Sequence, residues 1–111
     1  MGAMVVDPGR LSARLVLETS ADLSDGQGGV SESWSPVATL WGRIEPQRAA
    51  AREQAGAALA PISHRVTIRY RDDIRHAMRF VYRNRVLEIR TLRDPDETRR
   101  YLVCDCEESQ P

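Results

Sequence analysis

Short stretches in which every second residue is apolar recur along this chain, and they constrain its fold more than any other feature. Side chains alternate between the two faces of a β-strand, so such a stretch buries one face and exposes the other. The clearest example runs from Arg65 to Arg71, where Val66, Ile68 and Tyr70 alternate with arginines and a threonine. The pattern therefore predicts a mainly β protein. It places strands at residues 13–18, 37–45, 65–71, 78–83, 86–92 and 100–107.

Turn-forming residues separate these strands. Residues 22–33 are rich in Gly, Ser and Asp, which predicts a loop that carries the tight turn of a hairpin. Pro36 and Pro46 are expected to bracket the second strand, because proline is confined to strand ends and edges. Asn84 tolerates left-handed backbone angles and stands where a hairpin must reverse. Further turns are predicted at residues 72–76 and 94–97.

Other segments lie outside the alternating pattern. Residues 1–10 are predicted to form a flexible N-terminal arm, as terminal segments do unless they dock on something. Residues 47–60 are dominated by alanine, with Leu59 as the only large apolar residue, so this segment buries little core surface. It is predicted as a short surface helix or a long loop that orders against a partner. A single β-barrel domain is expected over residues 11–107, followed by a short acidic tail at 108–111.

The length of the chain limits the architecture. With 111 residues it suits one domain and leaves no room for a second independent core. A small antiparallel barrel or sandwich is the natural way to close about six strands around one core. No apolar run approaches the roughly 20 residues that cross a bilayer, and no secretory leader is expected.

The composition excludes several kinds of chemistry. All 16 basic residues are arginine, so a Schiff-base lysine and a phosphate-loop lysine are both excluded. His64 and His76 have no cysteine or carboxylate at metal-ligand spacing, and His64 is expected to be a polar residue at a strand edge. Cys104 and Cys106 are expected to be reduced, buried thiols rather than half of a zinc site. We therefore expect no catalytic residues, no metal and no cofactor.

Charge is spread unevenly, although the net charge is zero. Residues 1–55 carry five arginines and seven acids, whereas residues 56–103 carry eleven arginines and six acids. The last residues, from Cys104 onward, add three acids and no base. Stacked copies could present acidic and basic faces to each other, although a solvated surface with an uneven charge would give the same pattern.

The arginine-rich β region, residues 65–85, is the one group of side chains in the sequence that indicates a specific function. It could neutralise phosphates while Tyr70 or Tyr82 stacked on bases. Because both tyrosines share a face with predicted core residues, and acids lie among the arginines, salt-bridged subunit contacts explain the region equally well. The candidates for intersubunit or channel contacts are Arg48, Arg52, Glu53, Arg65, Arg69 and Arg71. We expect most of the arginines at positions 65, 69, 71, 79, 83 and 85 to pair with carboxylates of the same or a neighbouring subunit.

Several of these segments occur in the same order along the chain as the motifs of a known protein family. The longest are VATLWGRIEP at residues 37–46 and SHRVTIRYR at residues 63–71, and the strand at residues 64–71 is the most specific part of the ordered set. The whole set resembles the phage head–tail joining family, the head-completion or stopper proteins of long-tailed phages, prophages and gene transfer agents, over roughly residues 11–107. The remaining segments of the set are residues 14–17, 33–34, 73–74, 79–82, 85–89, 94–97 and 101–104.

The resemblance implies a structural virion protein without enzymatic activity. It implies a homo-oligomeric ring, of six or twelve copies, at the head–tail interface, with the portal or adaptor above and a tail terminator or tail tube protein below. DNA would pass through the channel without specific binding, and no membrane is involved. Whether residues 47–60 plug the channel or contact neighbours stays open. The virion protein would be synthesised in the bacterial cytoplasm. The alternative that the arginines support is a small β-barrel module that binds single-stranded nucleic acid.

Overall fold

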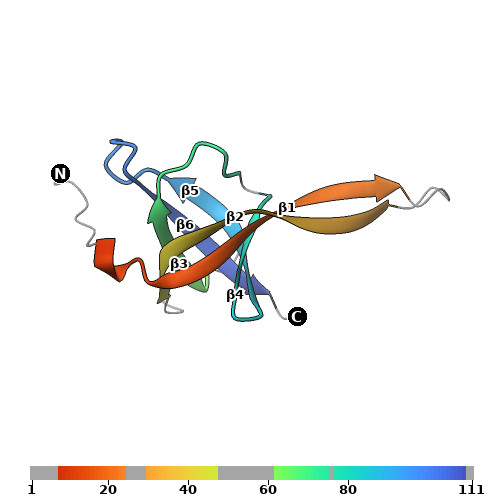
Figure 1. Ribbon diagram of the computed structural model, residues 1–111, viewed down its shortest axis with the longest axis horizontal. Coiled ribbons are helices and arrows are strands. Elements are labelled where there is room, and N and C mark those ends of the chain that lie inside the picture. Colours follow the sequence, from red (N-terminus) through yellow and green to blue (C-terminus); the bar gives the residue numbers. More distant parts are fainter. Residues whose placement is uncertain (1–7, 25–29, 48–61, 76, 110–111) are drawn as a thin grey trace.

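The computed structural model contains six antiparallel strands that close into a barrel in the order β1-β2-β3-β6-β5-β4 (Figure 1). The structure describes residues 8–24, 30–47, 62–75 and 77–109. The mainly β fold and its closure as a small barrel are therefore confirmed. The elements are a 3-10 turn, Pro8–Arg10, and the strands β1 (Ala13–Ser24), β2 (Val30–Pro46), β3 (His64–Arg69), β4 (Arg79–Tyr82), β5 (Arg85–Arg93) and β6 (Tyr101–Ser109).

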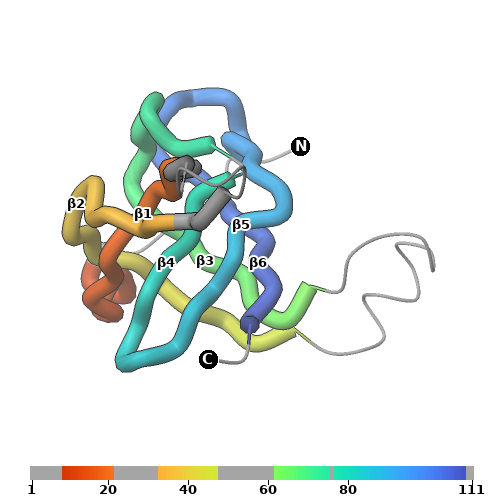
Figure 2. The backbone as a smooth tube through the Cα atoms, turned by 90° about the vertical axis from the view of Figure 1, so that its right-hand side faces the viewer, coloured from red at the N-terminus to blue at the C-terminus, as the bar shows by residue number. Residues whose placement is uncertain are grey.

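The inward faces of the strands form one core, as the alternation predicts. Tyr70 and Tyr82 pack against this core, so neither is an exposed platform for stacking bases. Cys104 and Cys106 are buried free thiols, as expected. Figure 2 views the barrel from another side and shows the strands encircling this interior. The largest fully buried side chains are Phe80, Leu15, Leu17, Ile68, Leu87 and Ile89.

Gly42 on β2 packs closely against residues of both neighbouring strands, β1 and β3. A Cβ atom at this position would lie 2.7 Å from Leu15 Cδ1, 3.0 Å from Ile68 Cγ2 and 3.0 Å from the carbonyl oxygen of Thr67. Contacts below about 3.4 Å are repulsive for carbon atoms. Glycine at this position therefore lets three strands pack around the same point of the core.

The outward face of β3 is less solvated than its arginines suggest. Thr67, expected on a solvated face, is 1% exposed, and its partner Val103 on β6 is 2% exposed. Arg43 and Arg93 flank this pair in the same cross-strand row. Long arginine stems cover neighbouring surface, which is the physical reason that outward positions on a small barrel become buried.

The prediction of a loop over residues 22–33 is wrong at residues 22–24 and 30–33, which belong to strands, while residues 25–29, with the predicted tight turn, lie outside the described residues. β1 continues to Ser24 and β2 begins at Val30, because the two strands pair along their whole length and so stabilise residues of low β propensity. Pro36 lies within β2 rather than before it. The register shifts there, from Leu17 opposite Ala38 to Glu18 opposite Pro36, so a bulge accommodates the proline. Pro46 ends β2 as expected.

The hairpin of β4 and β5 reverses where the sequence indicates. Asn84 has φ 65° and Arg83 has φ 49°, and both are left-handed values. Two such residues in succession form the turn whose twist matches that of the flanking strands. The predicted reversal at Asn84 is confirmed.

The distal part of the β1–β2 hairpin extends away from the barrel (Figure 1). β1 pairs with β4 only over residues 16–18, and β2 pairs with β3 only over residues 42–46. Among the described residues, 19–24 and 30–35, hereafter the ribbon, therefore form backbone pairs only with each other. The elongated dimensions of 54 × 33 × 26 Å reflect this projection. A two-stranded ribbon without further packing is marginally stable in water.

Candidate intersubunit surfaces

The arginines that the sequence singles out do not form one basic surface. Arg65 on β3 donates from Nε to Asp105 Oδ1 at 3.2 Å. Arg71 donates two hydrogen bonds to Asp73, at 2.9 and 2.8 Å. Arg69 is exposed and has no acidic partner within the described part of the chain. The other candidates, Arg48, Arg52 and Glu53, lie outside the described residues.

Most of the arginines on β3, β4 and their turns are neutralised within one copy. Four of the six that were expected to pair with carboxylates do so. The further pairs are Arg79 with Glu18 at 2.8 Å and Arg85 with Glu108 at 2.9 Å. The hydrogen bond from Arg85 is the main cause that lowers the pKa of Glu108. A continuous phosphate-binding groove would need these charges free.

Arg79 anchors the ribbon where it leaves the barrel. Its Nε donates to Glu18 Oε1 at 2.8 Å, and its guanidinium carbon lies 3.9 Å from the centroid of the Trp34 ring. The side chains of Arg79 and Glu18 are 22% and 19% exposed, so the ion pair is largely shielded from water. One side chain of β4 thus holds β1 and β2 together beside the bulge. The sequence predicts that Arg79 pairs with a carboxylate, but it does not predict the stacking on Trp34.

Four outward-facing residues form a row across the neighbouring strands β1, β2, β3 and β6. Arg14 pairs with Trp41 across β1 and β2, and Arg69 pairs with Tyr101 across β3 and β6. β2 and β3 pair up to Gly42, which lies opposite Ile68. One residue further along the same register, Trp41 lies beside Arg69. We call Arg14, Trp41, Arg69 and Tyr101 the Trp41 row. Trp41 is 59% exposed, which is high for so large an apolar side chain.

A groove of about 400 Å³ lies beside Trp41 and Arg69, the two central residues of this row. Leu11 and Leu40 supply apolar surface, while Trp41 and Arg69 contribute an indole and a guanidinium. Arginine and tryptophan are enriched among the residues that dominate binding energy at protein interfaces. The alternation over residues 37–45 already indicates that Trp41 points outward, and that is the signal by which the sequence could have identified it.

A second hollow, of about 570 Å³, opens at the end of the barrel where β3 begins. Interior-facing Ile44, His64 and Tyr82 line it together with Arg85 at the rim. His64 is 8% exposed, so the prediction of a strand-edge position is wrong: the residue faces the barrel interior, in line with Val66 and Ile68.

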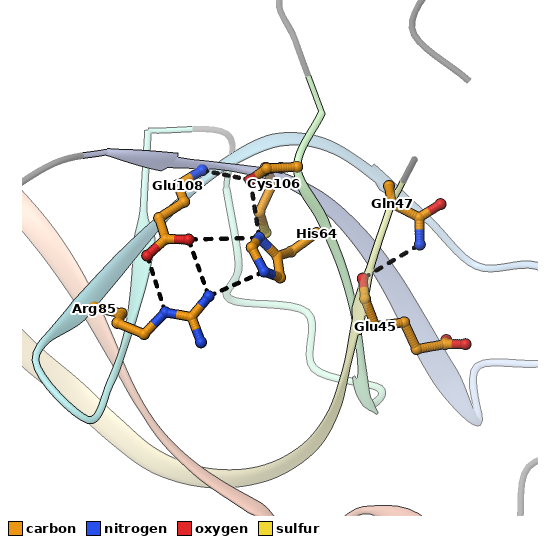
Figure 3. A network of polar contacts seen from close by, with 7 residues as sticks. Glu45, Gln47, His64, Arg85, Cys106 and Glu108 are labelled. Atoms are coloured by element: carbon orange, nitrogen blue, oxygen red, sulfur yellow. Dashed lines mark hydrogen bonds and ion pairs between the residues drawn. The ribbon is translucent and has the colours of Figure 1, made fainter. Parts of the chain in front are cut away.

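A polar network surrounds His64 (Figure 3). Arg85 Nη2 donates to His64 Nε2 at 3.0 Å, so His64 Nδ1 carries the proton and donates to Ser63 Oγ at 2.9 Å. The backbone N–H of Glu108 donates to the same hydroxyl at 2.7 Å. Burial, and then the charge of Arg85, lower the pKa of His64. The imidazole is therefore neutral near pH 7.

The same network fixes both ends of the segment that joins β2 to β3. Gln47 N–H donates to the Ser63 carbonyl oxygen at 2.8 Å, and Ser63 N–H donates to that of Cys106 at 2.9 Å. Residues 48–61, which include most of the predicted helix or loop, lie outside the described residues. Their two anchor points are held against β6, at the barrel end that also carries His64.

The described residues hold neither a metal centre nor a membrane-spanning helix. Over residues 8–24, 30–47, 62–75 and 77–109, no group of three or more His, Cys, Asp or Glu is arranged to hold a metal ion. Within the same described ranges, no helix has the length and apolar character of a membrane span.

Comparisons with known proteins agree on the kind of fold. A family model described as phage head completion protein matches residues 6–109. The solution structure of protein SF1141 from Shigella flexneri 2a is 31% identical, covers 94% of this chain and 97% of that chain, and has a TM-score of 0.73. A chain from the virion of a native gene transfer agent particle has the same fold, with 22% identity, 86% and 93% coverage and a TM-score of 0.63. A search of curated proteins gave no match.

Proposed function

Because this chain belongs to the phage head completion protein family, we propose that it is a structural virion component that joins the head to the tail. In this proposal, copies of the chain form a ring at the head–tail interface. The ring contacts the portal or adaptor on one side and a tail terminator or tail tube protein on the other, and it closes or lines the DNA channel.

One observation carries the proposal beyond the family name: two surfaces of the barrel are left uncovered by the described residues. Within that part of the chain the two strands of the ribbon pair only with each other, and the Trp41 row exposes an indole between two arginines. A soluble monomer rarely keeps both a bare strand pair and an exposed aromatic side chain. In a larger assembly, neighbouring chains cover both of these surfaces.

A structural role without catalysis is supported by the state of the chemically active groups. Both ring nitrogens of His64 are hydrogen-bonded, so neither is open to a substrate. Burial raises the pKa of the Cys104 thiol to about 12, and it raises that of Cys106 further. Thiols in this state are poor nucleophiles at neutral pH.

Passage of DNA without specific binding is supported by the pairing of the arginines. Arg65, Arg71, Arg79 and Arg85 already contact carboxylates in the same copy. Each phosphate that a protein neutralises adds affinity and salt dependence, and paired arginines contribute little of either. A channel wall of this kind lets DNA slide.

A second function has one specific observation in its favour. The exposed Trp41 between Arg14 and Arg69 could stack an unpaired base while the arginines contact phosphates. This is the single-stranded nucleic-acid-binding barrel.

The test of the head–tail role is the location of the chain in particles. Particles purified from a producing strain are imaged with an antibody against the chain, beside particles from a strain that lacks the gene. We expect label at the head–tail junction, and untailed heads in the deletion strain that are rescued by the gene in trans. Tailed, DNA-filled particles without the chain would contradict the proposal.

A further inference from the structure

We propose that β2 binds an extended acidic segment of a different protein along its open edge at residues 37–41, so that the segment adds a strand to the barrel. The source of the segment rests on the proposed function, in which this chain contacts other structural proteins of the particle. The binding chemistry rests on the open edge, the groove beside it and the charges around Trp41.

One edge of β2 has no backbone partner over much of its length. β2 pairs with β3 only over residues 42–46. Beyond that point β3 stays with β6, because the Tyr70 N–H donates to the Arg100 carbonyl oxygen at 2.9 Å. Among the described residues, no strand therefore pairs with residues 37–41 on the side of β2 that faces away from β1.

The sequence of this edge lacks the features that protect strand edges from other chains. Proline and charged side chains normally block pairing at an exposed edge. Residues 37–41 read VATLW and contain neither. Pro36 has no N–H to donate, and the bulge beside it interrupts the ladder, so an added strand would pair over residues 37–41 and end there.

The groove of about 400 Å³ follows this edge. Consecutive residues of two segments line it, 39–41 of β2 and 68–71 at the end of β3, together with Leu11. Consecutive side chains of a strand point to opposite faces, so a groove that all of residues 39–41 line runs along the strand edge rather than over one face. A strand paired with these residues would lie in the groove, in the place that β3 leaves.

The side chains around the groove favour an acidic segment with apolar neighbours. Arg69 and Arg14 are exposed and have no acidic partner among the residues that the structure describes. Trp41 lies between them and is itself exposed. A carboxylate on the added strand would pair with an arginine, while an apolar residue would cover the indole. In strand addition, main-chain hydrogen bonds provide affinity and such side-chain contacts provide specificity.

The charges of this chain indicate that the segment belongs to a different protein. Over residues 9–21, 33–47, 62–75 and 77–109, every carboxylate on a strand already contacts an arginine of the same copy. Within those ranges, a second copy has no free acidic strand to offer. A neighbouring protein at the head–tail junction supplies the segment instead.

Binding of a synthetic peptide to the full chain tests this chemistry. The probe is a short fluorescein-labelled peptide in which valine alternates with glutamate, and its anisotropy reports binding. We expect Arg69→Glu to weaken binding at least about tenfold, because close interfacial charge pairs contribute at least that factor. Arg69 is exposed, so the thermal unfolding midpoint should stay unchanged. The matched control Arg83→Glu, in the β4–β5 turn, should bind like the wild type.

Two control peptides distinguish strand addition from charge attraction alone. Lysine in place of glutamate reverses the charge, and N-methylation of the backbone removes the amide donors while keeping every side chain. Each change should weaken binding at least about tenfold. A dissociation constant above about 1 mM for the glutamate peptide, or equal binding of either control peptide, would overturn the inference.

Photo-cross-linking in assembled particles identifies the source of the segment. Thr39→Cys protein that carries benzophenone maleimide is added to heads from a strain that lacks the gene, and cross-linked peptides are sequenced by mass spectrometry. Thr39 is exposed and the natural cysteines are buried, so the label marks this edge. We expect a peptide of another structural protein, with a carboxylate in a β-forming stretch, and no such product from Arg83→Cys. A peptide of this chain, from residues 1–7 or from a second copy, would overturn the inference.

The outcomes separate this binding edge from the proposed function. Heads that the chain completes would still support the head–tail role if the peptide tests fail. Heads that do not take up the chain would instead contradict the head–tail role. If the glutamate peptide does not bind, while Trp41→Ala and Arg69→Glu abolish binding of single-stranded DNA at about 0.15 M salt, the Trp41 row is a nucleic-acid site and the inference is wrong.

Discussion

Replacing Arg79 with methionine should loosen the ribbon from the barrel and lower the stability of the whole domain. Methionine keeps an unbranched, flexible side chain but removes the guanidinium that contacts Glu18 and Trp34. The stacking on Trp34 contributes roughly 0.5–1 kcal/mol. The charged hydrogen bond to Glu18 contributes about 1.5 kcal/mol, since both side chains are mostly shielded from water. We therefore expect a loss of about 2 kcal/mol, which lowers Tm by roughly 8–10 °C.

Urea denaturation followed by tryptophan fluorescence measures this loss. In a Trp41→Phe background, Trp34 is the only reporter, and its emission should also change in the native state when the guanidinium is removed. The matched control is Arg83→Met. Arg83 also stacks on a ring, with its guanidinium carbon 5.1 Å from the centroid of Tyr82, but it has no acidic partner among the described residues. It should cost no more than about 0.5 kcal/mol.

Two results would refute the reasoning. An Arg79→Met chain within about 0.5 kcal/mol of the wild type would show that the anchor carries no stability. Equal losses for Arg79→Met and Arg83→Met would show that stacking alone, and not the ion pair, accounts for the effect.

Three further predictions test other parts of the structure. Gly42→Ala should cost about 2 kcal/mol through overpacking, and the cost in chemical denaturation should be smaller in a Leu15→Val background, where the contacted methyl group is gone. Because the pKa of His64 is lowered in the folded state, the unfolded chain binds more protons, so stability should fall as the pH drops below about 6.5. Thermal unfolding of His64→Gln should lose that part of the pH dependence, whereas His76→Gln should keep it. Deleting residues 49–58 should leave the circular dichroism spectrum of the barrel intact, because the anchors at both ends remain, but particles carrying the deletion should leak DNA or fail to take tails; normal infectious particles would contradict a role for this segment.

Local alternation in the sequence was sufficient to predict the inward faces of the strands. Leu15, Ile68 and Phe80 are buried because an apolar residue at every second position leaves a strand only one face to bury. The reversal at Asn84 was equally local, since the turn depends on the backbone angles of two neighbouring residues. The mainly β structure therefore followed from the sequence alone, as did the family, whose motifs are contiguous stretches of residues. The choice between a barrel and a sandwich did not, because closure depends on which strands pair.

Only the tertiary structure decided which strands pair and in which register. The strands of the ribbon extend over residues 19–24 and 30–35, which are rich in serine, because β1 and β2 hold each other extended, and the bulge next to Pro36 depends on that pairing. The burial of His64 depends on the same long-range contacts, since its network joins residues from three strands. The Trp41 row likewise exists only once four strands stand side by side. Register is set by contacts between residues far apart in the sequence, so no local pattern in the chain contains it.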